Sequence, residues 1–288
     1  MRSGNPHFFV ALLAAIIPVT GAAGAFAQVS SGNATCRDYI GKQVAKLADT
    51  VIREEVKCQQ NRALGSVHAS VDCSVPDNPA FPGLVTIAKI AGRLSDKIAT
   101  KCSAASAPAG NGYAACPSPC DGAVPSIASY SDVAACLICE TKAATSTAIM
   151  AVYGANPPIQ GTRDAAWKCQ NIRIGKGLRT YGKKRMTEQR KCQSQEDKAK
   201  IDPTDCQSAD LKGAIQKAIA QLQTSITKCS NDDLAALTSC ATTPAAEVVC
   251  AESSADSMAD TLFSNVYPEP STPDDGCALN DNTTASSP

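Results

Sequence analysis

Four closely spaced cysteines are the residues of this chain best placed to do chemistry. Cys136-Leu-Ile-Cys139 has the CxxC spacing of a redox dithiol, and Cys116-Pro-Ser-Pro-Cys120 precedes it. A CxxC at the start of a helix lowers the thiol pKa and supports disulfide exchange. Four thiolates at such spacings also bind zinc. No βαβ pattern surrounds the CxxC and no histidine follows it, which disfavours thioredoxin-like and haem-attachment motifs.

Other catalytic groups are sparse. The chain has two histidines, His7 in the N-terminal segment and His68 in a loop between expected helices. This disfavours Ser-His-Asp and Cys-His catalysis and histidine-rich metal sites. The neighbouring carboxylates Glu54-Glu55 and Asp232-Asp233 fall at a helix end and a helix start, where solvated or capping roles are expected.

No pattern in the chain points to a bound ion or a cofactor. The acidic segment 274–282, DDGCALNDN, lacks the spacing of a calcium loop, and no glycine-rich phosphate loop is present. We therefore expect no enzymatic activity, no metal and no cofactor.

The first 27 residues predict an export signal. Arg2 supplies a positive charge, residues 8–19 are apolar, and Ala25-Phe26-Ala27 has the small-x-small pattern of a cleavage site after Ala27. The apolar core is too short to span a bilayer, and no later stretch is judged apolar enough, so no transmembrane segment is expected after cleavage. The sequence thus predicts a secreted, periplasmic or cell-surface protein.

Export changes the interpretation of the cysteines, because an oxidising compartment favours disulfides over thiolates. All 15 cysteines follow the export signal. Disulfides are therefore preferred over a redox pair or a zinc site at the four cysteines above. Because 15 is odd, one cysteine must stay free or pair with another chain.

The chain repeats itself. Lys57-Cys58-Gln59 ends in Asp72-Cys73, and Lys191-Cys192-Gln193 ends in Asp205-Cys206. Ile-Gly-Lys lies 18 residues before the first cysteine of each motif, and Thr-Lys-Cys-Ser occurs at 100–103 and 227–230. A repeat at this scale usually marks one supersecondary unit used twice.

Each unit is expected to be helical. Ile40, Val44, Leu47 and Val51 share one helix face. Two further stripes have the same period: Leu84, Ile87, Leu94, Ile98 and Cys102, and then Leu211, Ile215, Ile219, Leu222, Ile226 and Cys229. Strand patterns are weak.

The predicted fold class is all-α, with two related disulfide-stapled units, each an αα-hairpin followed by a third helix. The expected third helices are 132–153 and 245–265. The expected organisation is a signal peptide at 1–27, unit one at 28–155, a linker at 156–162, unit two at 163–267 and a disordered, acidic, low-complexity tail at 268–288.

Antiparallel hairpins predict which cysteines meet, because the start of one helix lies beside the end of the next. The bridges expected from this geometry are Cys36–Cys102, Cys58–Cys73, Cys169–Cys229 and Cys192–Cys206. The remaining loop cysteines should staple the third helices, with Cys240–Cys250 expected in unit two. Cys116 and Cys120 should pair with Cys136 and Cys139, in either combination. About seven bridges leave Cys277, which is unpaired or joins two chains in a homodimer.

These Lys-Cys and Asp-Cys hairpins resemble cysteine-rich exported proteins of bacteria that have no assigned activity. The resemblance implies export and helical repeats, and it implies no activity.

Charge is uneven along the chain. All 27 lysines and arginines precede Cys229, and 10 acidic residues follow it. Lys176, Arg179, Lys183 and Arg190 lie along one side of an expected helix. They suggest a patch for an anionic glycan or lipid, whereas nucleic acid is not expected in an exported chain poor in aromatic residues. Glycosylation sequons occur at Asn33 and Asn282.

The sequence thus favours an exported, non-catalytic structural or binding protein. The alternative is an extracytoplasmic carrier that holds an apolar small molecule or lipid between its helices. A cysteine-based metal or redox protein is the third interpretation.

Overall fold

The computed structural model describes residues 29–154, 157–237 and 240–268. The export signal, most of the predicted tail, Cys277 and Asn282 lie outside the described residues. The described part of the chain is all-α and contains no strand. The expected all-α class is therefore confirmed.

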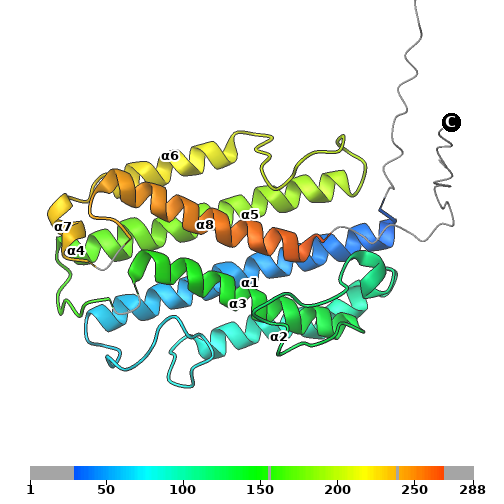
Figure 1. Ribbon diagram of the computed structural model, residues 1–288, viewed down its shortest axis with the longest axis horizontal. Coiled ribbons are helices and arrows are strands. Elements are labelled where there is room, and N and C mark those ends of the chain that lie inside the picture. Colours follow the sequence, from blue (N-terminus) through cyan, green and yellow to red (C-terminus); the bar gives the residue numbers. More distant parts are fainter. Residues whose placement is uncertain (1–28, 155–156, 238–239, 269–288) are drawn as a thin grey trace, which may run out of the picture.

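Six long helical segments form the body of the protein (Figure 1). They are α1 (Ser31–Ala63), α2 (Leu84–Lys101), α3 (Tyr130–Tyr153), the continuous run of α4 (Ala165–Lys168), η2 (Cys169–Gly175) and α5 (Lys176–Glu196), then α6 (Ala214–Ile226) and α8 (Pro244–Val266). Two short elements, η1 (Pro108–Asn111) and α7 (Asn231–Ala235), lie in connecting loops.

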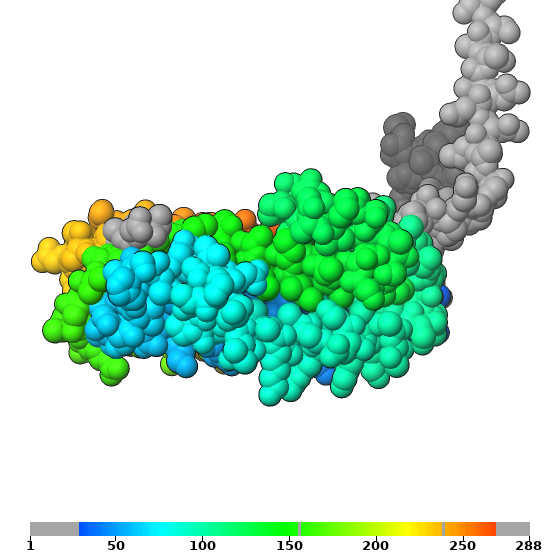
Figure 2. All heavy atoms as spheres, turned by 90° about the horizontal axis from the view of Figure 1, so that it is seen from below, coloured from blue at the N-terminus to red at the C-terminus, as the bar shows by residue number. Residues whose placement is uncertain are grey.

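The helices pack as a bundle with α1 and α5 side by side at its centre. Helices α3 and α8 contact each other and pack on α1 and α5, respectively. Helix α2 packs on α1 and α3, and α6 packs on α5 and α8, so these two helices lie at the edges. Seen from below, α2 and its flanking loops cover most of α1 (Figure 2).

The apolar stripes become the core as expected. Ile40, Val44, Leu47 and Val51 are at most 2% exposed, and Ile87, Leu94 and Ile98 are fully buried. Local signals set the helix ends. Ser30 accepts a hydrogen bond from the Asn33 N–H at the start of α1, and Ser129 forms a capping box with Asp132 at the start of α3.

Leu211 was expected on the buried stripe of the sixth helix, and this is wrong. Leu211 is 52% exposed and precedes α6. Gly213 has φ +64°, which a residue with a side chain rarely adopts, and the Asp210 carboxylate accepts from the N–H groups of residues 214–216. Because these two residues fix the start of α6, Leu211 stays in the loop.

The η2 segment is a π-helical turn with a visible origin in the sequence. Cys36 lies four residues before Ile40, whereas Cys169 lies five residues before Ile174. A π-turn closes i→i+5 hydrogen bonds and so holds one more residue than an α-turn. It takes up this extra residue, and Ile174 remains buried at 0% exposure as Ile40 does.

Two tyrosine–glycine contacts link the halves of the chain. Tyr153 at the end of α3 has its hydroxyl against Gly175, and Tyr267 after α8 has its hydroxyl against Gly41. A Cβ carbon on either glycine would collide with the phenol, so both positions require glycine. These glycines are the ones in the two Ile-Gly-Lys motifs.

Candidate functional site

The four clustered cysteines are all taken up in disulfides. Cys116 is joined to Cys136 and Cys120 to Cys139, with Cα–Cα distances of 5.6 and 5.9 Å. The CxxC cysteines are therefore bonded to the preceding loop rather than to each other. A sulfur in a disulfide is neither a nucleophilic thiolate nor a thiolate ligand for zinc. In the described ranges no group of three or more His, Cys, Asp or Glu could hold a metal ion.

The remaining bridges join the expected pairs: Cys36–Cys102, Cys58–Cys73, Cys169–Cys229 and Cys192–Cys206 of the hairpins, and Cys240–Cys250 at the third helix of the second half. Their Cα–Cα distances lie between 4.6 and 6.3 Å, within the normal range. Each bridge ties a helix to the end of its neighbour or to an adjoining loop.

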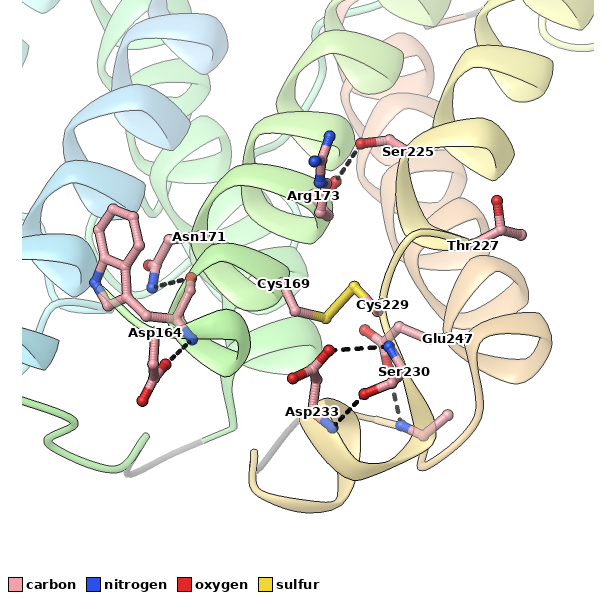
Figure 3. The surroundings of a disulfide bond; sticks show 12 residues. Asp164, Cys169, Asn171, Arg173, Ser225, Thr227, Cys229, Ser230, Asp233 and Glu247 are labelled. Atoms are coloured by element: carbon pink, nitrogen blue, oxygen red, sulfur yellow. Dashed lines mark hydrogen bonds between the residues drawn. A yellow bond between two sulfur atoms is a disulfide. The ribbon is translucent and has the colours of Figure 1, made fainter. Parts of the chain in front are cut away.

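The bridge between Cys169 and Cys229 shows how the ends are held (Figure 3). It joins the first residue of η2 to the loop after α6. Directly after Cys229, the Ser230 hydroxyl accepts from the Asp233 N–H, and the Asp233 carboxylate accepts from the Ser230 N–H. This capping box begins α7, so the loop that carries Cys229 is fixed on both sides.

His68 and the aspartate pair lie where the sequence suggests. His68 is exposed in a loop, and its Nδ1 lies 2.8 Å from the Ser70 hydroxyl. Asp233 is the capping residue described above. Neither residue belongs to a buried catalytic constellation.

The expectation that Glu54-Glu55 is solvated is wrong for both residues and most clearly for Glu55. Glu55 is fully buried, and its Oε1 accepts a 2.5 Å hydrogen bond from the Ser146 hydroxyl of α3. Burial raises the pKa of Glu55 to about 8. The sequence held a signal for this, since Glu55 lies four residues after Val51 and continues the apolar stripe of α1.

The basic patch differs most from its expected role. Arg179 and Lys183 both bind the Asp49 carboxylate of α1, at 2.8 and 3.1 Å, and Arg190 binds Asp38 of α1 at 2.6 Å. Although burial opposes it, the two cations hold the pKa of Asp49 below its usual range. Three of the four predicted cations thus join α5 to α1. Lys176 is the exposed member of the set that has no ion pair in the described chain.

A buried ion pair adds to this helix contact. Arg37 on α1 donates to Asp197 at the end of α5 at 3.0 Å, and both side chains are at most 4% exposed. Arg37 also donates to the Pro268 carbonyl and lies over the Tyr267 ring at 5.4 Å. No local pattern in the sequence indicates this pair, because the partner of the buried charge comes from a distant helix.

The sequon at Asn33 lies in the first turn of α1. The side-chain oxygen accepts from the Ser106 N–H at 2.7 Å, and the side-chain nitrogen donates to the Ser106 hydroxyl at 3.2 Å. The nitrogen that a glycan would modify is therefore engaged within the fold.

Helix α3 contradicts the expectation that no stretch after the export signal is apolar enough to span a membrane. By length and composition Tyr130–Tyr153 is apolar enough to cross a membrane, with a mean hydropathy of 1.3 over its most apolar window. More than half of this window is buried inside the protein, and α3 packs on α1, α2 and α8. Its hydropathy is therefore accounted for by its place in the bundle.

An open groove of about 540 Å³ lies between α3 and α8. One side is the Glu140, Ala143, Ala144, Thr147, Ala148 and Ala151 face of α3; the other is Ser253, Ser254, Ser257, Met258 and Thr261 of α8. Ser118 and Pro119 close one end. The groove is lined mainly by small and hydroxyl-bearing side chains rather than by large apolar ones.

Comparison of this chain with protein-family models, with curated proteins and with solved structures finds no match. Any functional assignment therefore depends on the geometry of these residues.

Proposed function

We propose that this protein is an exported, non-catalytic structural or binding protein, located in the periplasm, at the cell surface or outside the cell. The observation that carries the proposal is the set of seven disulfides in the described chain. Such a set is typical of chains that fold in oxidising compartments. The expected export signal and cleavage after Ala27 agree with it.

The state of the reactive groups supports a non-catalytic role. Cys136 and Cys139 are each committed to a bridge with the preceding loop, and His68 is an exposed loop residue. Glu55, whose pKa burial raises to about 8, is enclosed in the core at 0% exposure and has no access to a substrate. A rigid, cross-linked bundle is well suited to presenting a fixed surface to a partner.

We also infer that the bundle consists of two related units, 28–155 and 163–267. The reciprocal contacts support this: each unit ends in a tyrosine that covers the Ile-Gly-Lys glycine of the other unit. In both units, the residue three positions before the isoleucine of the Ile-Gly-Lys motif also contacts the tyrosine of the other unit. Asn171 accepts a hydrogen bond from Tyr153 at 3.2 Å, and Arg37, which precedes Ile40 by the same three residues, lies over Tyr267.

The carrier of an apolar ligand receives less support from the geometry. The groove between α3 and α8 has the volume of a ligand site, but it is rich in hydroxyl groups. Ligand pockets for apolar molecules are usually lined by large apolar and aromatic side chains. Lys176, the member of the predicted basic patch that has no ion pair in the described chain, lines a smaller groove of about 230 Å³ together with its neighbour Arg173, and this groove is where an anionic partner would meet the patch.

Two measurements on the oxidised protein test the proposal. A broad panel of hydrolase and oxidoreductase substrates should give no turnover above that of a heat-denatured control. Extraction of the native protein with organic solvent should give no stoichiometric lipid. Turnover that one point mutation abolishes would refute the non-catalytic role, and a stoichiometric lipid would favour the carrier.

A further inference from the structure

The groove between α3 and α8 contains a carboxylate whose environment in the fold is incomplete. Glu140 is 2% exposed and lines the groove. Its Oε2 accepts a hydrogen bond from the Asn265 side chain at 3.2 Å, and the backbone N–H of Cys120 also lies near the carboxylate, but its Oε1 meets no donor with full hydrogen-bond geometry. A buried acceptor left without a donor is costly, and such atoms in folded proteins call for an explanation.

The loop beside Glu140 is held firmly in place. Cys139 directly precedes Glu140 and is bonded to Cys120, which directly follows Pro119 at the end of the groove. The disulfide therefore joins the residue next to Glu140 to the residue next to Pro119, and so fixes the loop relative to α3. Such a fixed arrangement is what a binding site needs, because little ordering remains to be done when a ligand arrives.

Three hydroxyl groups that line the groove are placed as acceptors. Ser253 and Ser254 both donate to the Cys250 carbonyl, at 3.1 and 2.8 Å, and Thr147 donates to the Ala143 carbonyl at 2.9 Å. Because each hydroxyl hydrogen is used within its own helix, each oxygen keeps lone pairs to accept hydrogen bonds. Of the residues that line the groove, Glu140 alone carries a charge.

We propose that the groove between α3 and α8 binds a slender chain that ends in a primary ammonium group, and that the ammonium group is held by Glu140. An ammonium group has three donors and no acceptor, which matches one carboxylate and a row of hydroxyl oxygens. The small side chains of Ala143, Ala144, Ala148 and Ala151 on α3 leave room for a methylene chain. A volume of about 540 Å³ is in the range of small-molecule sites.

The same chemistry has two sources, a free aliphatic amine and the lysine side chain of a partner protein.

The inference rests on the proposed role as a binding scaffold, because it names the ligand class for one surface of that scaffold. The scaffold itself is tested separately by the count of free thiols, so a fully bridged protein that binds no amine would reject only the groove.

The test is a titration of the oxidised mature protein, followed by amide chemical shifts in NMR spectra. Cadaverine supplies the free amine, a short lysine-containing peptide supplies the side chain, and pentanediol is the neutral counterpart of cadaverine. We expect saturable shifts at residues of α3 and α8 with one or both amines and none with pentanediol. Tighter binding of the peptide would identify a partner's lysine as the source, and tighter binding of cadaverine would identify a free amine.

Four variants locate the binding. Glu140→Gln keeps the shape of the side chain and should weaken amine binding by about 10-fold or more, the effect expected for a hydrogen bond to a charged group. Ser257→Leu fills the groove from an exposed position and should block it. Ser264→Leu, on α8 outside this groove, is the matched control for Ser257→Leu and should bind as wild type does, and Asp121→Asn, which removes a nearby exposed acid, should weaken binding much less than Glu140→Gln.

Circular dichroism and melting temperature establish that each variant is folded. The proposal is overturned if wild type shows no saturable amine binding at millimolar concentrations. It is equally overturned if pentanediol binds as well as cadaverine, or if folded Glu140→Gln binds amines as tightly as wild type.

Discussion

The hydroxyl of Tyr153, the last residue of α3, lies against Gly175, the last residue of η2. The contact joins the first half of the chain to the second. It has a counterpart in the contact between Tyr267 and Gly41, where the halves exchange roles.

Replacing Gly175 by alanine should therefore destabilise the protein. Alanine is the better helix former by about 1 kcal/mol, but its methyl group must displace a fully buried phenol, and overpacking costs about 1–3 kcal/mol. Gly92→Ala is the matched control, because a Cβ at this position of α2 meets nothing within 4 Å. Urea unfolding with the disulfides intact should show a lower free energy of unfolding for Gly175→Ala and a higher one for Gly92→Ala. A gain at both positions would show that the contact is not close.

Glu55 should make stability fall as pH rises. Its pKa is about 8 in the fold against 4.5 as the ordinary value, so the folded state binds the extra proton between these limits. Stability is then highest below about pH 4.5 and declines up to about pH 8, by at most about 1.4 kcal/mol per pH unit from this group.

Glu55→Gln should remove this decline, and the variant should be more stable than wild type at alkaline pH. Glu54→Gln removes the same charge one residue away, from an ion pair with Arg53, and should leave the slope in place. Melting curves across the pH range measure both. An unchanged slope in Glu55→Gln would assign the pH dependence to other groups.

The buried pair Arg37–Asp197 should show strong coupling. Removing one partner leaves an uncompensated buried charge, which costs about 3–5 kcal/mol, whereas replacing both by apolar residues often costs little. Asp197→Leu alone should be much less stable than Arg37→Met combined with Asp197→Leu. Denaturant unfolding of the single and double variants gives the coupling energy, and simple additivity would contradict the close contact at 3.0 Å.

Asp49 should control how basic the surface of α5 is. Asp49→Asn removes the negative charge that pairs with both Arg179 and Lys183. Both cations then become available to an anionic polymer, so the variant should leave a heparin column at higher salt than wild type. Asp96→Asn on α2 changes the net charge equally, and its elution should shift less. Equal shifts would mean that the two cations are already available in wild type.

The helices were predictable from the sequence because burial imposes a period on one chain segment at a time. The stripes on α1 and α2 and the capping residues beside α3 and α7 are all local signals. The prediction that Leu211 is buried was wrong because Gly213 and Asp210 fix the start of α6 after Leu211. Their local geometry overrides the continuation of the apolar stripe.

The candidate site was less predictable, since it depends on which helices face each other. Arg179 and Arg190 look like a solvated basic face until α1 places Asp49 and Asp38 opposite them. The pairing of Cys116 and Cys120 stayed open because Cys136 and Cys139 are one helical turn apart, so that both combinations were sterically reasonable. Glu140 had a signal that was not used: it lies on the apolar face of α3, seven residues after Val133 and eight before Ala148.

The most direct test of the stapled scaffold is a disulfide map of the unreduced mature protein, with free thiols counted under denaturing conditions. The account predicts seven intramolecular bridges, including Cys116–Cys136 and Cys120–Cys139. It also predicts one free thiol at Cys277, or no free thiol together with a disulfide-linked dimer. Four or more free thiols, or a bridge between Cys136 and Cys139, would contradict it and return the loop cysteines to redox or metal chemistry.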